Sequence, residues 1–391
     1  MRILIINHRF LPYRGSSAEA VARLLEQFSI IPGLEIEMIT TSQDEQYYLQ
    51  KMGDSITIHL LPIIRKSQNP EIWSKKELRE FANKAHELTK KLAKKNSYDL
   101  LHSFYSFPGG YVGFRLKRKF KLPYMISLRA SDVAMHSEKF SSFFDIFFPS
   151  ISAIREKADI LVANSDALRT SMMTLDEKKQ IQVIYDGFCP KEFFPCLELR
   201  NPDQFYILCV SDITPENGVR FLIQAFNVLS DRYSQIRLLV IGDGSEKITL
   251  EELVLGMGME DKVAFLERGD DGEKMLSHYQ KSDVFVLPSL NEKLSDDIKD
   301  AMSCALPVIA TDAGSNKEFV CDGKNGLIVR DRNYNDLVEK IEKLILDKDL
   351  RLEMGRESRK IAESMSWENI AKEYLQAYEQ LINIDRIREE K

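Results

Sequence analysis

Two carboxylate side chains, Glu292 and Asp300, follow the short apolar run Val284–Leu287, which is typical of a buried strand. Asp300 lies eight residues after Glu292, and on a helix this spacing is two full turns plus about 80°. The two acids therefore share nearly one face. Carboxylates bind paired hydroxyl groups well and are poor neighbours for phosphate. The pair predicts a site for sugar-like hydroxyls, and two solvated helix residues are the simpler alternative.

The ends of three other predicted strands also have residues that can hold anions or hydroxyl groups. Gly15 and Ser16 precede a predicted helix; a glycine lets a ligand approach the backbone, and a helix N-terminus favours an anion. His102 and Arg129 lie at two later strand ends, and Arg129 together with Asp132 suits the hydroxyls or phosphate of a substrate. The alternatives are a plain turn at Gly15, a salt bridge between Arg129 and Asp132, and a structural hydrogen-bonding role for His102.

The composition argues against several other classes of protein. A net charge of −6 gives no electrostatic case for nucleic acid as a partner. The absence of a GxGxxG segment argues against a nicotinamide or flavin enzyme. Five cysteines without a CxxC pair predict neither a zinc site nor a disulfide framework. Because there is no signal-peptide pattern and no apolar stretch of about 20 residues, we expect a cytoplasmic protein.

Short apolar runs alternate with amphipathic helical stretches along nearly the whole chain, and this pattern predicts parallel sheets covered by helices on both faces. The first series of predicted strands comprises Arg2–Ile6, Glu35–Thr40, Thr57–Leu61, Leu100–Ser103, Tyr124–Leu128, Ile160–Ala163 and Gln182–Ile184. The second series comprises Tyr206–Val210, Arg237–Gly242, Val263–Leu266, Val284–Leu287, Pro307–Thr311 and Gly326–Val329. We therefore predict an α/β protein with two doubly wound, Rossmann-like halves.

The 391 residues are too many for a single hydrophobic core, so the doubled series fits two domains. We expect an N-terminal domain over 1–190, a proline-rich linker over 191–203 and a C-terminal domain over 204–366. An amphipathic helix follows over 367–391. Ligands of open α/β sheets bind beyond the carboxyl ends of the strands, which is where the candidate residues lie.

An ordered set of segments resembles the signature of glycosyltransferase family 4, group 1, whose members have the GT-B architecture. The segments are Pro288–Glu292, Asp300–Met302, Pro307–Thr311, Ala313–Glu318, Asp322–Gly326, Gly242–Ser245 and Ser366–Glu368, with His102–Gly110, Arg129–Asp132 and Ala163–Ser165 in the first half. Each segment is a weak signal by itself, whereas the set is specific and spans essentially the whole chain. The resemblance implies two domains facing a central cleft, with the last helix crossing back to the first domain.

The resemblance also implies a function and roles for the residues. The chain is expected to transfer a sugar from a UDP- or GDP-type nucleotide-sugar with retention of configuration, without a metal ion or other cofactor. Glu292, Arg129 and His102 are the implied catalytic residues, with Glu292 holding the donor sugar and Asp300 the ribose hydroxyls. The backbone of Leu294 and Ser295 would face the diphosphate. The remaining implied donor-binding positions are Gly15, Ser16, Asp212, Asn217, Gly242, Arg268, Lys293 and Glu318.

The chain departs from the family where the diphosphate would bind. Asp212 and Asn217 occupy positions where the family has Arg and Lys. A charge-assisted hydrogen bond contributes about 1.5–3 kcal/mol, so losing two could remove ~3–6 kcal/mol of binding. A replacement cation would come from Arg14, Arg268, Lys293, Lys299 or Lys317.

Two functions remain open at this stage: a glycosyltransferase, and a degenerate GT-B protein that binds a sugar, nucleotide or partner without turnover. A sugar-nucleotide epimerase is a distant third. The acceptor is an unidentified glycan, lipid or small molecule. The segment Phe114–Lys121 mixes basic and aromatic residues and is compatible with peripheral contact to the inner face of an anionic membrane, although a solvated helix face is the commoner explanation.

Overall fold

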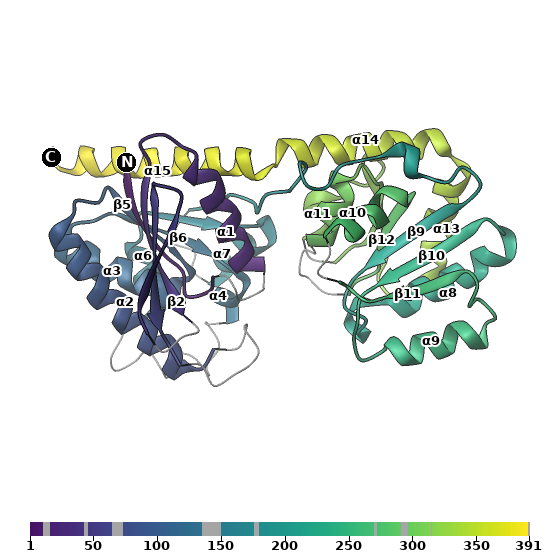
Figure 1. Cartoon of the computed structure of the whole chain (residues 1–391), viewed down its shortest axis with the longest axis horizontal. Helices are drawn as coiled ribbons and strands as arrows, with labels where there is room; N and C mark the ends of the chain where they lie inside the picture. Colours follow the sequence, from purple (N-terminus) through teal and green to yellow (C-terminus); the bar gives the residue numbers. More distant parts are fainter. Residues whose placement is uncertain are drawn as a thin grey trace. The chain divides into compact units, whose positions relative to one another are not determined.

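The computed structural model describes residues 1–10, 16–42, 46–64, 73–134, 150–175, 180–269, 272–290, 296–313 and 315–389. The chain forms two compact units (Figure 1). The first consists of residues 1–187 together with 367–391, and the second of residues 188–366. Each unit has its own sheet and hydrophobic core.

The described part of the first unit contains a sheet in the order β3-β4-β2-β1-β5-β6-β7-β8. Its strands are β1 (Arg2–Ile6), β2 (Glu35–Ser42), β3 (Tyr48–Met52), β4 (Ile56–Pro62), β5 (Leu100–Phe104), β6 (Tyr124–Leu128), β7 (Ile160–Ala163) and β8 (Ile181–Val183). All neighbours pair in parallel except β3 with β4. The central strands β5 and β6 are buried along their whole length, as expected for strands covered on both faces.

The helices of the first unit are α1 (Ser16–Ser29), α2 (Lys75–Lys95), α3 (Tyr111–Phe120), α4 (Ala130–Ala134), α6 (Ile151–Lys157), α7 (Asp166–Leu175) and α15 (Trp367–Glu389), with a π-helical turn η1 (Tyr105–Gly110). Helix α2 shows how the sequence sets such an element. Its N-cap Ser74 accepts a hydrogen bond from the Glu77 backbone, and the Glu77 carboxylate accepts one from the Ser74 backbone at 2.7 Å, forming a capping box. The buried Leu78, Phe81 and Ala85 then recur at helical spacing and enter the core.

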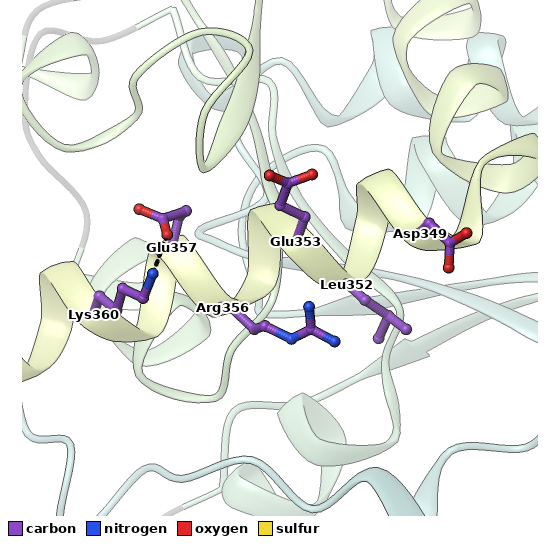
Figure 2. Close-up of a pocket in the computed structure, with 6 residues that line it drawn as sticks. All are labelled: Asp349, Leu352, Glu353, Arg356, Glu357 and Lys360. Carbon is purple, nitrogen blue, oxygen red and sulfur yellow. Dashed lines mark hydrogen bonds and ion pairs between the residues drawn. The ribbon is translucent and has the colours of Figure 1, made fainter.

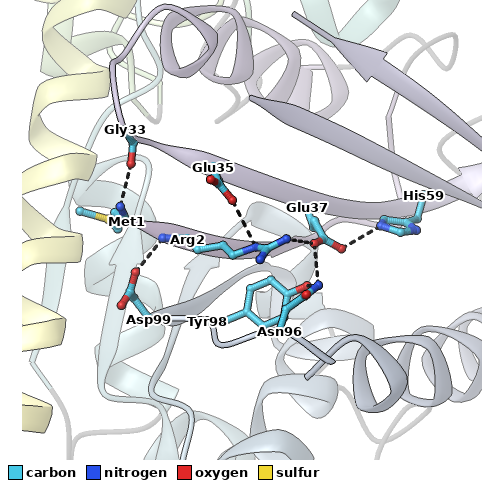
Figure 3. Close-up of polar contacts among 9 residues, drawn as sticks. All are labelled: Met1, Arg2, Gly33, Glu35, Glu37, His59, Asn96, Tyr98 and Asp99. Atoms are coloured by element: carbon cyan, nitrogen blue, oxygen red, sulfur yellow. Dashed lines mark hydrogen bonds and ion pairs between the residues drawn. The ribbon is translucent and has the colours of Figure 1, made fainter. Parts of the chain in front are cut away.

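A polar cluster ties together the elements around the start of β1 (Figure 3). The guanidinium of Arg2 donates to Glu37 at 2.9 Å, and the backbone N–H of Arg2 donates to Asp99 at 2.6 Å. Glu37 also contacts His59 Nε2 at 3.1 Å and accepts from Asn96 at 3.3 Å. The cluster joins β1 to β2, β4 and the end of α2. It therefore lies away from the carboxyl ends of the strands, where the candidate residues lie.

The last helix, α15, belongs to the first unit although it follows the second in sequence. Its buried side chains Ile370, Tyr374, Ala377 and Tyr378 recur at helical spacing, and the helix packs against α1 and β5. Close packing also fixes its start, because a Cβ at Gly187 would lie 2.6 Å from the ring of Trp367.

The second unit has an all-parallel sheet in the order β11-β10-β9-β12-β13-β14 within its described residues. The strands are β9 (Phe205–Val210), β10 (Ile236–Ile241), β11 (Val263–Leu266), β12 (Val284–Leu287), β13 (Val308–Thr311) and β14 (Gly326–Val329). The helices are α8 (Val219–Arg232), α9 (Lys247–Gly256), α10 (Gly272–Lys281), α11 (Asp296–Ser303), α12 (Asn316–Phe319), α13 (Tyr334–Leu346) and α14 (Lys348–Ser364), with 3₁₀ turns η2 (Leu197–Leu199) and η3 (Pro215–Asn217).

The predicted α/β class with two Rossmann-like halves is confirmed, and the predicted strands agree with the observed ones to within a few residues. Strand β3 was not predicted. It is an exposed edge strand, so it lacks the apolar run that marks the others. Residues 191–203, predicted as a linker, lie within the second unit. There Gln280 donates to the Phe194 carbonyl at 2.9 Å, and Arg359 donates to the Phe193 carbonyl at 3.0 Å.

Glycine at the end of β10 is required by close packing of two backbones. A Cβ on Gly242 would lie 1.9 Å from the carbonyl oxygen of Ser211, at the end of β9.

We expect Gly242→Ala to lower the free energy of unfolding by at least about 1–3 kcal/mol, because the added carbon overpacks against rigid backbone. The measurement is urea denaturation, with Gly256→Ala as control. A Cβ there meets nothing within 4 Å, so the control should be neutral or gain about 0.5–1 kcal/mol. Equal stability of the two variants would contradict this account.

Candidate functional site

At the carboxyl edge of the first sheet, three consecutive strands place side chains in one hydrogen-bonded group. Arg129 follows β6, and its Nη1 donates to both carboxylate oxygens of Asp186, at 2.7 and 2.6 Å. Asn164, which follows β7, donates to the same carboxylate at 2.8 Å. Asp132 instead accepts backbone N–H groups from Arg129 at 2.9 Å and Ser106 at 2.8 Å. The salt bridge considered between Arg129 and Asp132 is therefore replaced by an ion pair with Asp186.

The environment of Arg129 keeps it positively charged. Burial opposes the charge, but the nearby Asp186 carboxylate outweighs it, so the pKa of Arg129 is raised. The guanidinium also lies over the ring of Phe104, 5.4 Å from the centroid. A cation held this firmly at a strand end can orient an anionic or hydroxylated group without moving, which is the property that a positioning group in catalysis needs.

His102, which the sequence predicts as a catalytic residue, lies in a buried hydrogen-bonded group. The side chain is fully buried, and both ring nitrogens are engaged, Nδ1 with the Tyr378 hydroxyl at 2.7 Å and Nε2 with the Ser127 hydroxyl at 2.8 Å. The Ser127 hydroxyl in turn contacts that of Tyr374 at 3.2 Å. Burial, with a smaller effect of Arg129, lowers the pKa of His102 to about 3. His102 is therefore a neutral anchor that holds α15 on the first sheet.

In the second unit, Asn217 joins two loops at the carboxyl edge of the sheet. Its side-chain amide donates to the carbonyl of Asp212 at 2.8 Å, and its oxygen accepts from the hydroxyl of Ser289, after β12, at 3.2 Å. Beside these bonds, the backbone N–H of Leu290 donates to the backbone carbonyl of Glu216 at 2.8 Å. A lysine at position 217 would lose both side-chain bonds, which gives a structural reason for asparagine here. The side chain of Asp212 is exposed.

Helix α11 begins with acidic residues that are paired with two cations. The carboxylate of Asp297, with a side chain 7% exposed, forms an ion pair with Arg268 and accepts from the Tyr279 hydroxyl at 3.4 Å. Lys299 pairs with Asp296 at 3.1 Å. Burial, followed by the charges of Asp297 and Asp296, raises the pKa of Asp300 well above its usual value. A carboxyl group with a perturbed pKa in the helix that follows a strand end is a candidate for a binding site.

Several predicted site residues cannot be placed. Gly15, Glu292, Lys293, Leu294 and Ser295 lie outside the described residues. Ser16 begins α1, and its side chain is not among the described ones. Glu318 is half-buried on α12. Gly242 lies at the end of β10.

Sequence reasoning missed four residues that hold the candidate residues in place: Asp186, Asp297, Tyr374 and Tyr378. The position of Asp186 just after β8 was the one available signal, because it matches that of Arg129 after β6. The partners of the other three are distant in sequence, and nothing local predicts them.

Within the described ranges, no group of three His, Cys, Asp or Glu side chains is arranged to hold a metal ion. None of the described helices has the length and apolarity needed to cross a membrane. A surface hollow of about 410 Å³ lies along α14, lined by the charged face of that helix (Figure 2). Its lining includes Asp349, at the start of α14. The hollow contains none of the predicted site residues.

Solved structures with the same fold define the class of the protein. Sucrose-phosphate synthase from Thermosynechococcus elongatus aligns with a TM-score of 0.75 and 23% identity, over 98% of this chain and 99% of that one. HepE from Anabaena, crystallised with UDP, aligns with a TM-score of 0.69 and 19% identity, over 97% and 100% of the two chains. The chain has the GT-B fold of glycosyltransferases.

Family models match both units. Residues 18–192 match the model for glycosyltransferase family 4, and residues 192–361 match that for glycosyl transferases group 1. An uncharacterised glycosyltransferase of Methanocaldococcus jannaschii is 27% identical over 375 residues, which is 95% of this chain and 96% of that relative. The chain belongs to the group 1 glycosyltransferases of family 4.

The anchoring role of His102 predicts a pH-dependent loss of stability. A histidine whose pKa is lowered on folding contributes stability above its ordinary pKa of about 6.5, and this contribution is lost as pH falls toward the folded value. His102→Gln should lower the free energy of unfolding at pH 7 by about 1–3 kcal/mol, because buried hydroxyls lose a partner. The variant should also be less sensitive than the parent between pH 7 and pH 5. Urea denaturation at both pH values measures this.

His278→Gln is the control, since His278 is only half-buried on α10. An unchanged stability of His102→Gln combined with complete loss of transfer would contradict the anchoring role and support a direct catalytic role for His102.

Proposed function

We propose that the protein transfers a hexosyl group from a nucleotide-sugar donor of the UDP or GDP type to a glycan, lipid or small-molecule acceptor, with retention of configuration and without a metal ion. The observation that carries the proposal is the family match, which extends through both units from residue 18 to residue 361. The UDP in the HepE structure supports the type of donor. The acceptor, and contact of α3 with an anionic membrane, stay predictions of the sequence.

In the proposed reaction, the bond between the anomeric carbon and the diphosphate oxygen breaks. A bond forms from that carbon to an acceptor hydroxyl, whose proton passes to the leaving nucleoside diphosphate. The diphosphate takes the electron pair of the broken bond. The second unit would hold the donor: Glu292 would bind the sugar, Asp300 the ribose, and Gly242 and Glu318 would line the site. Arg129, held by Asp186, is the proposed catalytic cation of the first unit.

One observation favours the alternative, a binding protein without turnover. The second unit has 23 basic and 33 acidic residues, a net charge of −10, whereas the first has 31 basic and 27 acidic residues, a net charge of +4. A strongly acidic unit with Asp212 and Asn217 beyond the carboxyl ends of its strands would bind a diphosphate weakly unless a cation lies near the site.

The experiment that separates the two functions is a calorimetric titration of the intact protein with UDP-, GDP-, ADP- and CMP-sugars, followed by assay of sugar release and transfer. If the protein is an enzyme, at least one donor should bind. Its sugar should also be released slowly when water is the only acceptor. Binding without turnover of any donor would favour the alternative. Absence of binding by all four donors would contradict the nucleotide-sugar proposal itself.

The raised pKa of Asp300 predicts opposite effects of Asp300→Asn on binding and on stability. A carboxyl whose pKa is raised on folding stabilises the protein fully below its ordinary pKa, and this contribution is lost as pH rises through the folded value. The variant should therefore gain melting temperature relative to the parent as pH rises from 4 to 8. At pH 8 its affinity for UDP should fall about tenfold or more, because ribose loses a charge-assisted hydrogen bond.

Asp296→Asn is the control, since Asp296 lies on the same helix with a side chain 53% exposed. Loss of both stability and binding at pH 8 in Asp300→Asn would show that Asp300 is structural.

A further inference from the structure

A donor site at the carboxyl edge of the second sheet has an electrostatic problem. Its loops carry the exposed Asp212, and α11 begins with Asp296 and Asp297, followed by Asp300. A helix N-terminus attracts anions, but carboxylates in its first turn reduce that attraction. A diphosphate bound here needs a cation nearby, and the two cations of the family are replaced by Asp212 and Asn217.

We propose that Arg268, oriented by Asp297, is the cation that binds the diphosphate of the nucleotide donor. This inference rests on the proposed function and names a residue pair for the donor site. Arg268 is thus a binding residue, and Asp297 is a positioning residue that acts through it.

Other cations near this edge are less suited, among those that the structure describes. Lys299 has a side chain only 7% exposed and is paired with Asp296. Lys317 is paired with Asp312, and the carboxylate of that pair is itself 52% exposed, so it would repel an incoming anion. Arg268 combines a side chain 50% exposed with a partner only 7% exposed. Half of the Arg268 side chain is open to solvent, whereas the side chain that anchors it is buried.

The strand order places Arg268 close to the strand ends where the donor would bind. Arg268 follows the edge strand β11, whereas α11, which begins with Asp296 and Asp297, follows β12. Strands β10 and β9 lie between β11 and β12. The ion pair therefore connects loops on either side of the two strands whose ends carry Gly242 and Asp212. Tyr279 of α10 donates to the same carboxylate at 3.4 Å and supports its orientation.

The charges around Arg268 fit this role. Burial opposes its charge, but Asp297, then Tyr279 and Asp300, raise its pKa. The guanidinium has five N–H donors in a planar fork, and one nitrogen, Nη2, faces Asp297. The fork can therefore keep its bond to Asp297 and also donate to phosphate oxygens, which it matches in geometry. Arg268 also lowers the pKa of Asp300, which opposes the larger rise caused by burial and by Asp297 and Asp296.

The test compares nucleotide affinities of Arg268→Gln, Arg268→Lys, Asp297→Asn and the double variant Arg268→Gln/Asp297→Asn, titrated with UDP and with uridine. Arg268→Gln should bind UDP about tenfold more weakly or worse, while its affinity for uridine, which lacks phosphate, stays within about twofold. Arg268→Lys should retain part of the UDP affinity because it keeps the charge. Asp297→Asn should weaken UDP binding less than Arg268→Gln, and the double variant should match Arg268→Gln alone.

Arg232→Gln is the matched control. The Arg232 side chain is 51% exposed and pairs with Glu342 at 2.9 Å. Its substitution removes the same charge from the same unit, at the last residue of α8. If the protein binds GDP rather than UDP, the same comparison uses GDP and guanosine. Equal UDP affinities of Arg268→Gln and Arg232→Gln would overturn the inference and leave the proposed function standing. An equal loss for UDP and uridine would also overturn it, since it would indicate a structural role. Absence of nucleotide binding by the parent protein would overturn both.

Discussion

Charge balance at the start of α11 is the constraint on which the proposed donor site depends. The carboxyl edge of a parallel sheet attracts anions because helix N-termini converge there. In this chain, the same edge bears Asp212, Asp296, Asp297 and Asp300, within a unit of net charge −10. A diphosphate can bind there only if a fixed cation compensates, and the ion pair of Arg268 with Asp297 supplies that charge.

The first unit solves a different problem, which is how to keep the end of the chain in place. Residues 188–366 form the second unit, so the chain leaves the first unit after Gly187 and returns at Trp367. His102, Ser127, Tyr374 and Tyr378 form one buried hydrogen-bonded group that fixes α15 on the sheet. Burial raises the pKa of both tyrosines, so their hydroxyls stay protonated as donors. The same region carries Arg129, whose charge is therefore held by a rigid support.

Much of the fold could be predicted from the sequence because the strands are buried runs of Ile, Leu and Val with helical crossovers between them. The exposed strand β3 gave no such signal. Contacts between distant residues set the limit for the site. The partner of Arg129 proved to be Asp186, 57 residues away, rather than the local Asp132. His102 lies inside β5 rather than at its end. Its bonds to Ser127 and Tyr378 make it an anchor, and Tyr378 is 276 residues away. The pattern located candidate residues and did not reveal which of them face each other.

The most direct test of the donor site is hydrogen exchange of the intact chain with and without UDP or its sugar conjugates. Binding at the proposed site should protect backbone amides in residues 211–218 and in α11, where loop and helix N–H groups would meet the nucleotide. The amides of Arg129 and of β6 in the first unit should change much less with UDP alone. Protection confined to the first unit, or none anywhere at saturating nucleotide, would contradict a donor site in the second unit.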